Sequence, residues 1–424
     1  MKELRLKKLM TGFLIGTMAL VLCLCTAAAV FAGNETLPKG TAEKPAGAAI
    51  TKVLQMPQGT ATPNAAFTFN IQKLSVDGDT SAEVLNKMPK LEGSISVAAD
   101  SISTLDGDKK IVTKNTGNLL AGKSWPHAGE YVYQITETAN TYTIADSNKE
   151  SLVYSQSEYK LHVYIAEAAS GALYVKSAGA VIVKNQNGKA EGDGGKVDPS
   201  VPTEVTEGNS LKFVNTYANT AGSGEAPDPD KQSAAVSKAV TGELASKTKY
   251  FPFEVTISNN SLISKASYKA YICTLNRSSY QKVSKAEANN QYDDGKDFVT
   301  FTVGMKKDIT LKHGQYLVFM DCPKGTVYNA NEKAVPGYKA AVHIVTGGTA
   351  ISPDPSNTAA NTALSTGERV ITAGGANTAA FTNTYATTVP TGIIIDNLPF
   401  IAMILIAIGA FIVFIVGKRR KRAR

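Results

Sequence analysis

Residues 213–217 read Phe-Val-Asn-Thr-Tyr, and residues 381–385 repeat this phrase as Phe-Thr-Asn-Thr-Tyr. Each phrase closes a segment that opens with a short apolar stretch around one lysine. Because alternate residues of a strand face the same side, each segment directs one lysine and one asparagine into an apolar core. An unpaired ammonium in such a core is too costly to keep, and a covalent Lys–Asn amide would remove both polar groups. The four side chains are Lys52, Asn215, Lys238 and Asn383.

A glutamate completes this chemistry in each copy. In residues 131–137 the alternating face carries two tyrosines, an isoleucine and then Glu137, and residues 328–332 repeat the Tyr-to-Glu spacing with Glu332. On a water-poor face the pKa of a carboxyl group is raised and that of a lysine is lowered. The neutral amine can then attack the asparagine carbonyl, while the protonated acid relays protons to the leaving ammonia.

The repeat places two domains in the chain. We predict a first domain over residues 49–217, a linker rich in Gly, Pro and Asp over 218–232, and a second domain over 233–386. Alternating strand signals dominate both domains, and few stretches have helical periodicity. The economical fold is therefore all-β, with two tandem immunoglobulin-like antiparallel β-sandwiches, each with an internal Lys–Asn isopeptide bond.

The two ends of the chain are targeting signals. Residues 1–32 join a basic start to an apolar run that ends in Val-Phe-Ala, which predicts a secretory signal peptide. Residues 400–416 form an uncharged apolar run long enough to span a bilayer, and a basic tail follows. Upstream stand Val389, Pro390, Thr391 and Gly392. Residues 389–424 thus resemble the sorting signal of Gram-positive wall-anchored proteins, which a sortase cuts between Thr and Gly.

Composition excludes several functional classes. The leader and the tail carry ten of the 44 basic and two of the 36 acidic residues, so the rest is balanced and indicates no nucleic-acid partner. The four histidines lack ligand spacing, and no catalytic or cofactor motif is present. We therefore expect no metal, no cofactor and no enzyme activity beyond a single self-reaction. Trp125 is interpreted as a packing residue.

Two cysteines remain after the leader, Cys273 and Cys322. An exported protein can pair them, although two thiols do not make a disulfide framework. The sequence leaves both alternatives open, a Cys273–Cys322 bridge and two free thiols.

The order of motifs resembles a known family. A lysine strand, a Phe-x-Phe strand, Tyr-x-x-x-Glu and Phe-x-Asn-Thr-Tyr follow one another as in the streptococcal pilin isopeptide-linkage domain, and the whole chain resembles the two-domain major pilins of Gram-positive bacteria. The second copy lacks the strand-like phrase around its glutamate, which leaves Asp321 as the alternative acid there. The resemblance implies amides between Lys52 and Asn215 and between Lys238 and Asn383, with Glu137 and Glu332 as the acids.

The resemblance also implies a function. It predicts a wall-linked or pilus-linked structural subunit, the backbone of a pilus, joined head to tail to identical subunits by a sortase that acts on Thr391. Related pilins carry the receiving lysine shortly before the last strand of the first domain, where this chain has Gly208. The candidates that remain are Lys184, Lys189 and Lys196, the last in a Gly-rich stretch that ends at a proline.

Two rival functions stay open at this point. The same domains could form a monomeric adhesin displayed singly on the wall, and a secreted β-sandwich enzyme is a more distant alternative. Minor pilins and peptidoglycan are further expected partners, and the sequence does not indicate a host ligand.

Overall fold

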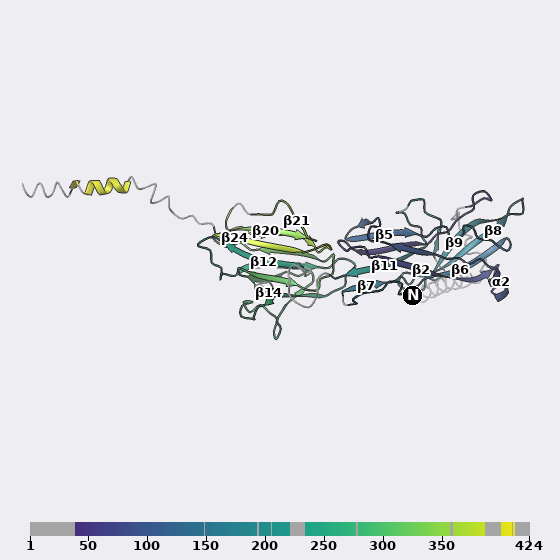
Figure 1. Cartoon of the computed structure of the whole chain (residues 1–424), viewed down its shortest axis with the longest axis horizontal. Helices are drawn as coiled ribbons and strands as arrows, with labels where there is room; N and C mark the ends of the chain where they lie inside the picture. Colours follow the sequence, from purple (N-terminus) through teal and green to yellow (C-terminus); the bar gives the residue numbers. More distant parts are fainter. Residues whose placement is uncertain are drawn as a thin grey trace, which may run out of the picture. The chain divides into compact units, whose positions relative to one another are not determined.

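The computed structural model describes residues 39–147, 149–192, 195–204, 206–220, 234–276, 279–356, 359–385, 400–408 and 410–411. The chain divides into two compact units, unit 1 up to Asn219 and unit 2 from Thr220 onward. Strands make up nearly all the regular structure of both units, and α2 (Ala82–Lys87) is a short helix of unit 1 (Figure 1). The predicted all-β fold is confirmed.

Unit 1 contains two sheets (Figure 1). The first has the order β4 (Thr104–Asp106), β5 (Lys109–Asn115), β1 (Thr51–Pro57), β11 (Lys212–Asn219) and β7 (Glu150–Val153). The second has the order β10 (Lys196–Val197), β9 (Leu173–Lys184), β8 (Glu158–Glu167), β6 (Gly129–Glu137), β2 (Ala65–Val76) and β3 (Ser94–Val97). The first and last strands of the first sheet by sequence, β1 and β11, are parallel neighbours.

Unit 2 repeats this arrangement with a larger first sheet. That sheet has the order β15 (Ser279–Lys282), β14 (Ser267–Asn276), β18 (Gln315–Phe319), β12 (Ala234–Thr241), β24 (Thr378–Tyr385), β20 (Tyr338–Thr346) and β21 (Thr349–Ala350), with β16 (Val299–Thr302) beside β14. The second sheet has the order β17 (Lys307–Leu311), β13 (Phe251–Ser258), β19 (Val327–Glu332) and β22 (Leu364–Ser365), with β23 (Arg369–Val370) beside β19. Here β12 and β24 are the parallel pair.

The apolar core around the lysine is divided in unit 1 and continuous in unit 2. In unit 1, Ile50 and Phe213 belong to one apolar cluster, whereas Leu54 and Tyr217 belong to another. The lysine of β1 and the asparagine of β11 lie between these clusters, because inward-facing positions recur every second residue. In unit 2 a single cluster includes the apolar neighbours on both sides of the corresponding lysine.

The chain ahead of β1 packs on unit 1. The backbone N–H of Gly40 donates to the carbonyl of Lys176, and that of Ala46 donates to the carbonyl of Val175. Ala48 and Ala49 are fully buried. Residues 40–49, most of which precede the predicted first domain, therefore form part of the fold beside β9.

Several predicted signals lie outside the described residues, namely the signal peptide, most of the linker and the four residues of the sorting motif. Residues 400–408 and 410–411 of the predicted apolar span are helical. Within the described ranges no helix reaches the length and apolarity needed to cross a bilayer.

Candidate functional site: two Lys–Glu–Asn clusters

The first cluster lies in the core of unit 1, where β1, β6 and β11 bring three polar side chains together. Lys52 Nζ is 2.8 Å from Glu137 Oε1 and 2.9 Å from Oε2. Asn215 Nδ2 donates to Glu137 Oε1 at 2.8 Å. Lys52 and Asn215 are fully buried, and the ring centroid of Phe67 lies 4.7 Å from the amine. One carboxyl group thus contacts both partners of the predicted amide.

The second cluster repeats this geometry in unit 2. Lys238 Nζ is 2.6 Å from Glu332 Oε1, and Asn383 Nδ2 donates to the same oxygen at 2.8 Å. The ring centroid of Phe251 lies 4.4 Å from the amine. The alternative acid, Asp321, instead forms an ion pair with Lys265 at 2.8 Å. The structure therefore brings Glu332, and not Asp321, to the lysine.

The parallel strand pairs fix this geometry. In both units the lysine lies opposite the phenylalanine of the final phrase, and the asparagine lies two residues further along its strand. A side chain that points into the core can then cross diagonally to its neighbour on the adjacent strand. The paired positions are Lys52 with Phe213, Leu54 with Asn215, Lys238 with Phe381, and Val240 with Asn383.

The asparagine carbonyls meet different surroundings. The backbone N–H of Ser155 donates to Asn215 Oδ1 at 2.8 Å. Asn383 Oδ1 and Glu332 Oε2 are buried, and within the described part of the chain neither has a hydrogen-bond partner. Sequence reasoning missed Ser155, since a backbone donor has no side-chain signature that a motif could reveal.

Burial moves the proton equilibria in the direction the chemistry needs. Desolvation lowers the pKa of Lys52 and of Lys238 to about 8, against the opposing effect of the neighbouring carboxylate. Desolvation likewise raises the pKa of Glu137 and of Glu332. A neutral amine beside a protonated acid holds as many protons as the ion pair, so one proton transfer inside the cluster makes the amine nucleophilic.

Two asparagines that the motifs did not single out form several hydrogen bonds with the chain near the start of the last strand of each unit. Asn209 Nδ2 donates to the carbonyls of Ala49, Pro199 and Ser200, and its Oδ1 accepts from Thr51 Oγ1 and Leu211 N–H. Asn377 Oδ1 accepts from the N–H groups of Gly347 and Thr372, and its Nδ2 donates to the carbonyls of Thr372 and Gly375. Their signal was an asparagine shortly before each final strand, three residues before Lys212 in unit 1 and one residue before Thr378 in unit 2.

The three candidate receiving lysines occupy different settings. Lys184 ends β9 and forms an ion pair with Glu158 at 2.7 Å. Lys196 lies in β10 opposite Val181, so its backbone is part of a sheet rather than of a Gly-rich loop. Lys189 is exposed on a turn in which its carbonyl accepts from the N–H of Asn185.

Gly208, where related pilins carry the lysine, packs against β1. A Cβ atom there would lie 2.7 Å from Thr51 Cγ2. A side chain at this position would therefore displace a buried threonine next to Lys52.

Cys273 and Cys322 are both buried and are not joined by a disulfide, so the alternative of a disulfide bridge is wrong. Cys273 lies in a small cluster with Ala235 and Val318, whereas Cys322 belongs to the main core of unit 2. Val318 alternates along β18 with residues of the main core, so the two thiols face opposite sides of one sheet. Burial also raises the pKa of Cys273 to about 12.

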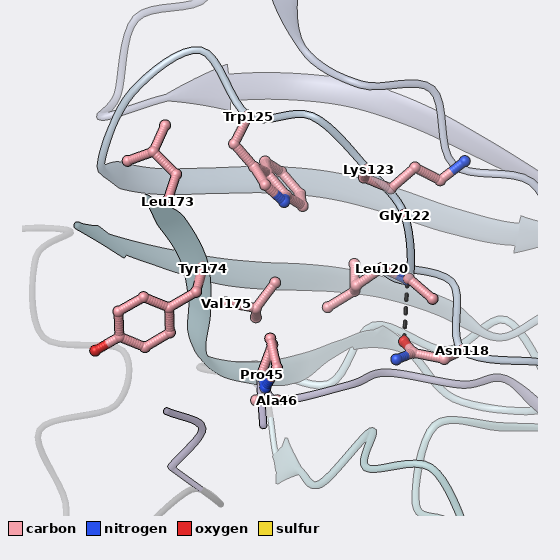
Figure 2. A pocket seen from close by; sticks show the side chains of 11 residues that line it. Pro45, Ala46, Asn118, Leu120, Gly122, Lys123, Trp125, Leu173, Tyr174 and Val175 are labelled. Atoms are coloured by element: carbon pink, nitrogen blue, oxygen red, sulfur yellow. Dashed lines mark hydrogen bonds between the residues drawn. The ribbon is translucent and has the colours of Figure 1, made fainter. Parts of the chain in front are cut away.

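A hollow of about 240 Å³ opens on unit 1 where the chain ahead of β1 meets the start of β9. Figure 2 shows Trp125, Leu120 and Val175 turned toward it, with Lys123 at its rim. Trp125 is buried and packs edge-on against Tyr131, with ring centroids 4.8 Å apart. The indole is thus a packing group of this wall rather than an exposed platform.

Comparisons with solved structures return pilus proteins. The major pilin of Streptococcus pyogenes is 17% identical, with 80% of this chain and 99% of that chain covered and a TM-score of 0.29. The major pilin T3.2 of the same species is also 17% identical, with 79% and 97% covered and a TM-score of 0.29. A pilus-presented adhesin is 11% identical, with 78% and 100% covered and a TM-score of 0.22. At this level of similarity these structures carry no argument about function.

Family models match each unit separately. Residues 232–385 match a domain of unknown function (DUF7601). No curated protein matches the chain. Residues 48–218 match the Spy0128-like isopeptide containing domain, which agrees with the predicted pilin isopeptide family. Residues 48–218 therefore form a domain of the Spy0128-like isopeptide containing kind.

Proposed function

We propose that this chain is a structural subunit of a covalent pilus shaft on a Gram-positive cell surface, assembled by a sortase and stabilised by one Lys–Asn amide in each unit. The observation that carries the proposal is the repeated cluster, in which a buried lysine and a buried asparagine from parallel strands contact one glutamate. The family match of residues 48–218 supports the amide chemistry.

The proposed reaction is an intramolecular acyl transfer. The neutral amine of the lysine attacks Cγ of the asparagine, the Cγ–Nδ2 bond breaks, and Nδ2 leaves as ammonia. The glutamate takes a proton from the lysine nitrogen and delivers one to Nδ2, so it ends the reaction as it began. Folding supplies the proximity, because both reactants already contact the same carboxyl group.

The position of the amides suits a fibre under tension. Each would join the first strand of a unit to its last strand, β1 to β11 and β12 to β24. In both pairs the strands are parallel, so the chain enters a unit at one end of the pair and leaves at the other. A pull along the chain would then load a covalent bond rather than the hydrogen bonds between strands.

Assembly of the shaft is the finer part of the proposal. A sortase would cleave between Thr391 and Gly392, and a lysine of the next copy would resolve the acyl-enzyme. Lys184, Lys189 and Lys196 remain the candidates, and all three residues are exposed. Minor pilins and peptidoglycan would be further partners on the cell surface.

An intact-mass measurement tests the amide chemistry. The folded protein, residues 33–391, should be lighter than its sequence mass by two ammonias, about 17 Da each. Glu137→Ala and Glu332→Ala should each restore one ammonia. A mass equal to the sequence mass would refute both amides.

Surface extracts test the assembly. Denaturing gels should show a ladder of high-mass species that disappears when the sortase is deleted. A single band at the subunit mass would favour the alternative, a monomeric wall-anchored adhesin.

A further inference from the structure

The two reactive asparagines differ at the atom on which charge develops during acyl transfer. Asn215 Oδ1 accepts a hydrogen bond from the Ser155 backbone N–H at 2.8 Å, and both residues are buried. Asn383 Oδ1 is equally buried but has no partner in the described part of unit 2. In both clusters the lysine and the asparagine contact the same glutamate oxygen, but Lys52 also contacts Glu137 Oε2, whereas Glu332 Oε2 has no partner among the described residues.

Strand pairing explains this difference. In unit 1 the outer neighbour of β11 is β7, which pairs with residues 216–219 and ends at Val153. The chain then leaves the ladder, and the N–H of Ser155 is available to a side chain. In unit 2 the neighbour of β24 is β20, which pairs with every residue of β24 and places Ala340 opposite Asn383.

The Ser155 bond also fixes the orientation of the Asn215 amide. If the amide were reversed, Nδ2 would face the Ser155 N–H, and two donors would oppose each other. The oxygen therefore faces the N–H, and the leaving nitrogen faces Glu137 Oε1 at 2.8 Å. The carbonyl and the leaving nitrogen of Asn215 thus have different hydrogen-bond partners, although the Ser155 N–H also lies close enough to Glu137 to lower the pKa of that carboxyl group.

We propose that the Ser155 backbone N–H is the oxyanion donor of the first cluster, and that the second cluster forms its amide without such a donor and more slowly. This inference rests on the proposed function. When Lys52 Nζ attacks Cγ, the carbonyl π electrons move onto Asn215 Oδ1, where the N–H stabilises the negative charge. Collapse restores the carbonyl and expels Nδ2 as ammonia, with the proton passed from Nζ through Glu137.

The second cluster has one group for two tasks. Its asparagine oxygen has no fixed partner, so the protonated carboxyl of Glu332 must polarise the carbonyl as well as serve the leaving nitrogen. Removal of one donor from an oxyanion site commonly slows a reaction by about 10²–10³. Because the Ser155 hydrogen bond already exists before attack, it accelerates the reaction only by the amount it strengthens in the transition state. We therefore expect the first amide to form at least about tenfold faster than the second.

Pulse–chase synthesis of residues 33–391 in a cell-free system measures both rates in one chain. A brief protease treatment removes unfolded chains at each time point, acid stops the reaction, and mass spectrometry quantifies the linked peptides. The Lys52–Asn215 link should appear at least about tenfold faster than the Lys238–Asn383 link. Equal rates, or a faster second link, would overturn the inference.

A pair of substitutions isolates the N–H. Ser155→Pro removes it, whereas Ser155→Ala keeps it and removes only the hydroxyl contacts with Gln186 and Ser157. We expect Ser155→Pro to slow the first link at least about tenfold, Ser155→Ala to leave it near the wild-type rate, and both to leave the second link unchanged.

The outcomes separate the two proposals. If both substitutions slow the first link equally, Ser155 acts through its side chain and the inference is wrong. If Ser155→Pro does not fold, the comparison of the two links in the unchanged chain still decides. If neither link ever forms, the proposed function itself fails.

Discussion

The two units hold the same three side chains in the same register but surround them differently. In unit 1 the Lys–Glu–Asn cluster lies between two groups of apolar core residues, and the Ser155 backbone N–H binds the asparagine carbonyl. In unit 2 the cluster sits beside one continuous core, and the carbonyl has no partner among the described residues. The motif therefore selects the reactants, whereas the neighbouring strand determines which groups bind the reactive amide.

The largest expected effect is on thermal stability. Lys52→Met should block the first amide, and Lys238→Met the second, with an apolar chain of similar length in place of each lysine. A cross-link that closes a loop of well over a hundred residues contributes about 5 kcal/mol. For units of this size that loss lowers the melting temperature by about 10–20 °C, which calorimetry can measure unit by unit.

The two substitutions serve as controls for each other. Lys52→Met should shift the transition of unit 1 and leave that of unit 2 in place, and Lys238→Met should do the reverse. If either substitution moved both transitions equally, the units would not be stabilised independently. If neither moved any, the cross-links would contribute nothing to stability.

A second prediction concerns pH and the rate of amide formation. Each cluster reacts while it holds one proton to share between lysine and glutamate. Above about pH 8 this proton is lost, since the lysine pKa is about 8 in both clusters, and the glutamate has none to deliver. At low pH a second proton binds, so the lysine stays charged and its amine cannot attack. Because burial raises the pKa of the glutamate, the pH below which the reaction slows is higher than it would be for an exposed glutamate.

The rates of both links should therefore follow bell-shaped profiles that fall about tenfold per pH unit beyond each limit. The alkaline limits should coincide in the two units, while the plateau rates differ. Pulse–chase in a series of buffers provides the measurement. A rate that keeps rising with pH would mean that deprotonation of the lysine suffices and that the glutamate is no acid.

A smaller effect compares the two asparagines before the final strands. Asn377→Ala removes four hydrogen bonds at a buried position, and Asn209→Ala removes five at a half-buried one. Because each leaves buried backbone groups unsatisfied, we expect a cost of about 2–4 kcal/mol in the unit concerned. The melting temperature of that unit should fall by about 4–16 °C, which calorimetry can measure.

Only one of these asparagines touches the first strand of its unit through its side chain. Asn209 bonds to Ala49 and Thr51 beside Lys52, so Asn209→Ala should also slow the first link. Asn377 bonds to Gly347, Thr372 and Gly375, so Asn377→Ala should leave the second link at its usual rate. If both substitutions left the rates of both links unchanged, the chain just before the last strand would play no part in aligning the reactants.

Much of the fold followed from period-two alternation. The buried faces of β1, β11, β12 and β24 are the ones predicted, because a one-residue shift would expose every apolar side chain of a strand. The lysines and asparagines of both clusters lie on those faces, and the glutamates lie on β6 and β19, so counting residues was enough to propose them. Glu332 lies in a regular strand although its sequence, Asn-Ala-Asn-Glu, has weak strand propensity.

The rest depends on contacts that counting cannot reveal. Neither the parallel pairing of β1 with β11 nor the end of β7 before Ser155 has a local signature, since both arise from which strands become neighbours. The separation of Cys273 from Cys322 is a matter of sheet faces and was left open by the sequence. Composition predicts a Gly-rich loop around Lys196, yet Lys196 and Val197 pair with β9.

The smallest expected effect concerns a feature of unit 2, the cluster around Cys273 on the second face of its larger sheet. Three partly buried tyrosines, Tyr271, Tyr280 and Tyr316, pack against this cluster, and burial raises the thiol pKa to about 12. Because the thiolate is the reactive form, a maleimide should label neither cysteine of the native protein at pH 7 within minutes, and both after unfolding. Tyr316→Ala should open the cover over Cys273 and speed its labelling several-fold, while Cys322, in the main core on the other face, stays protected. Equal acceleration at both thiols would mean that the substitution loosens the whole unit, and the two faces would then not be independent.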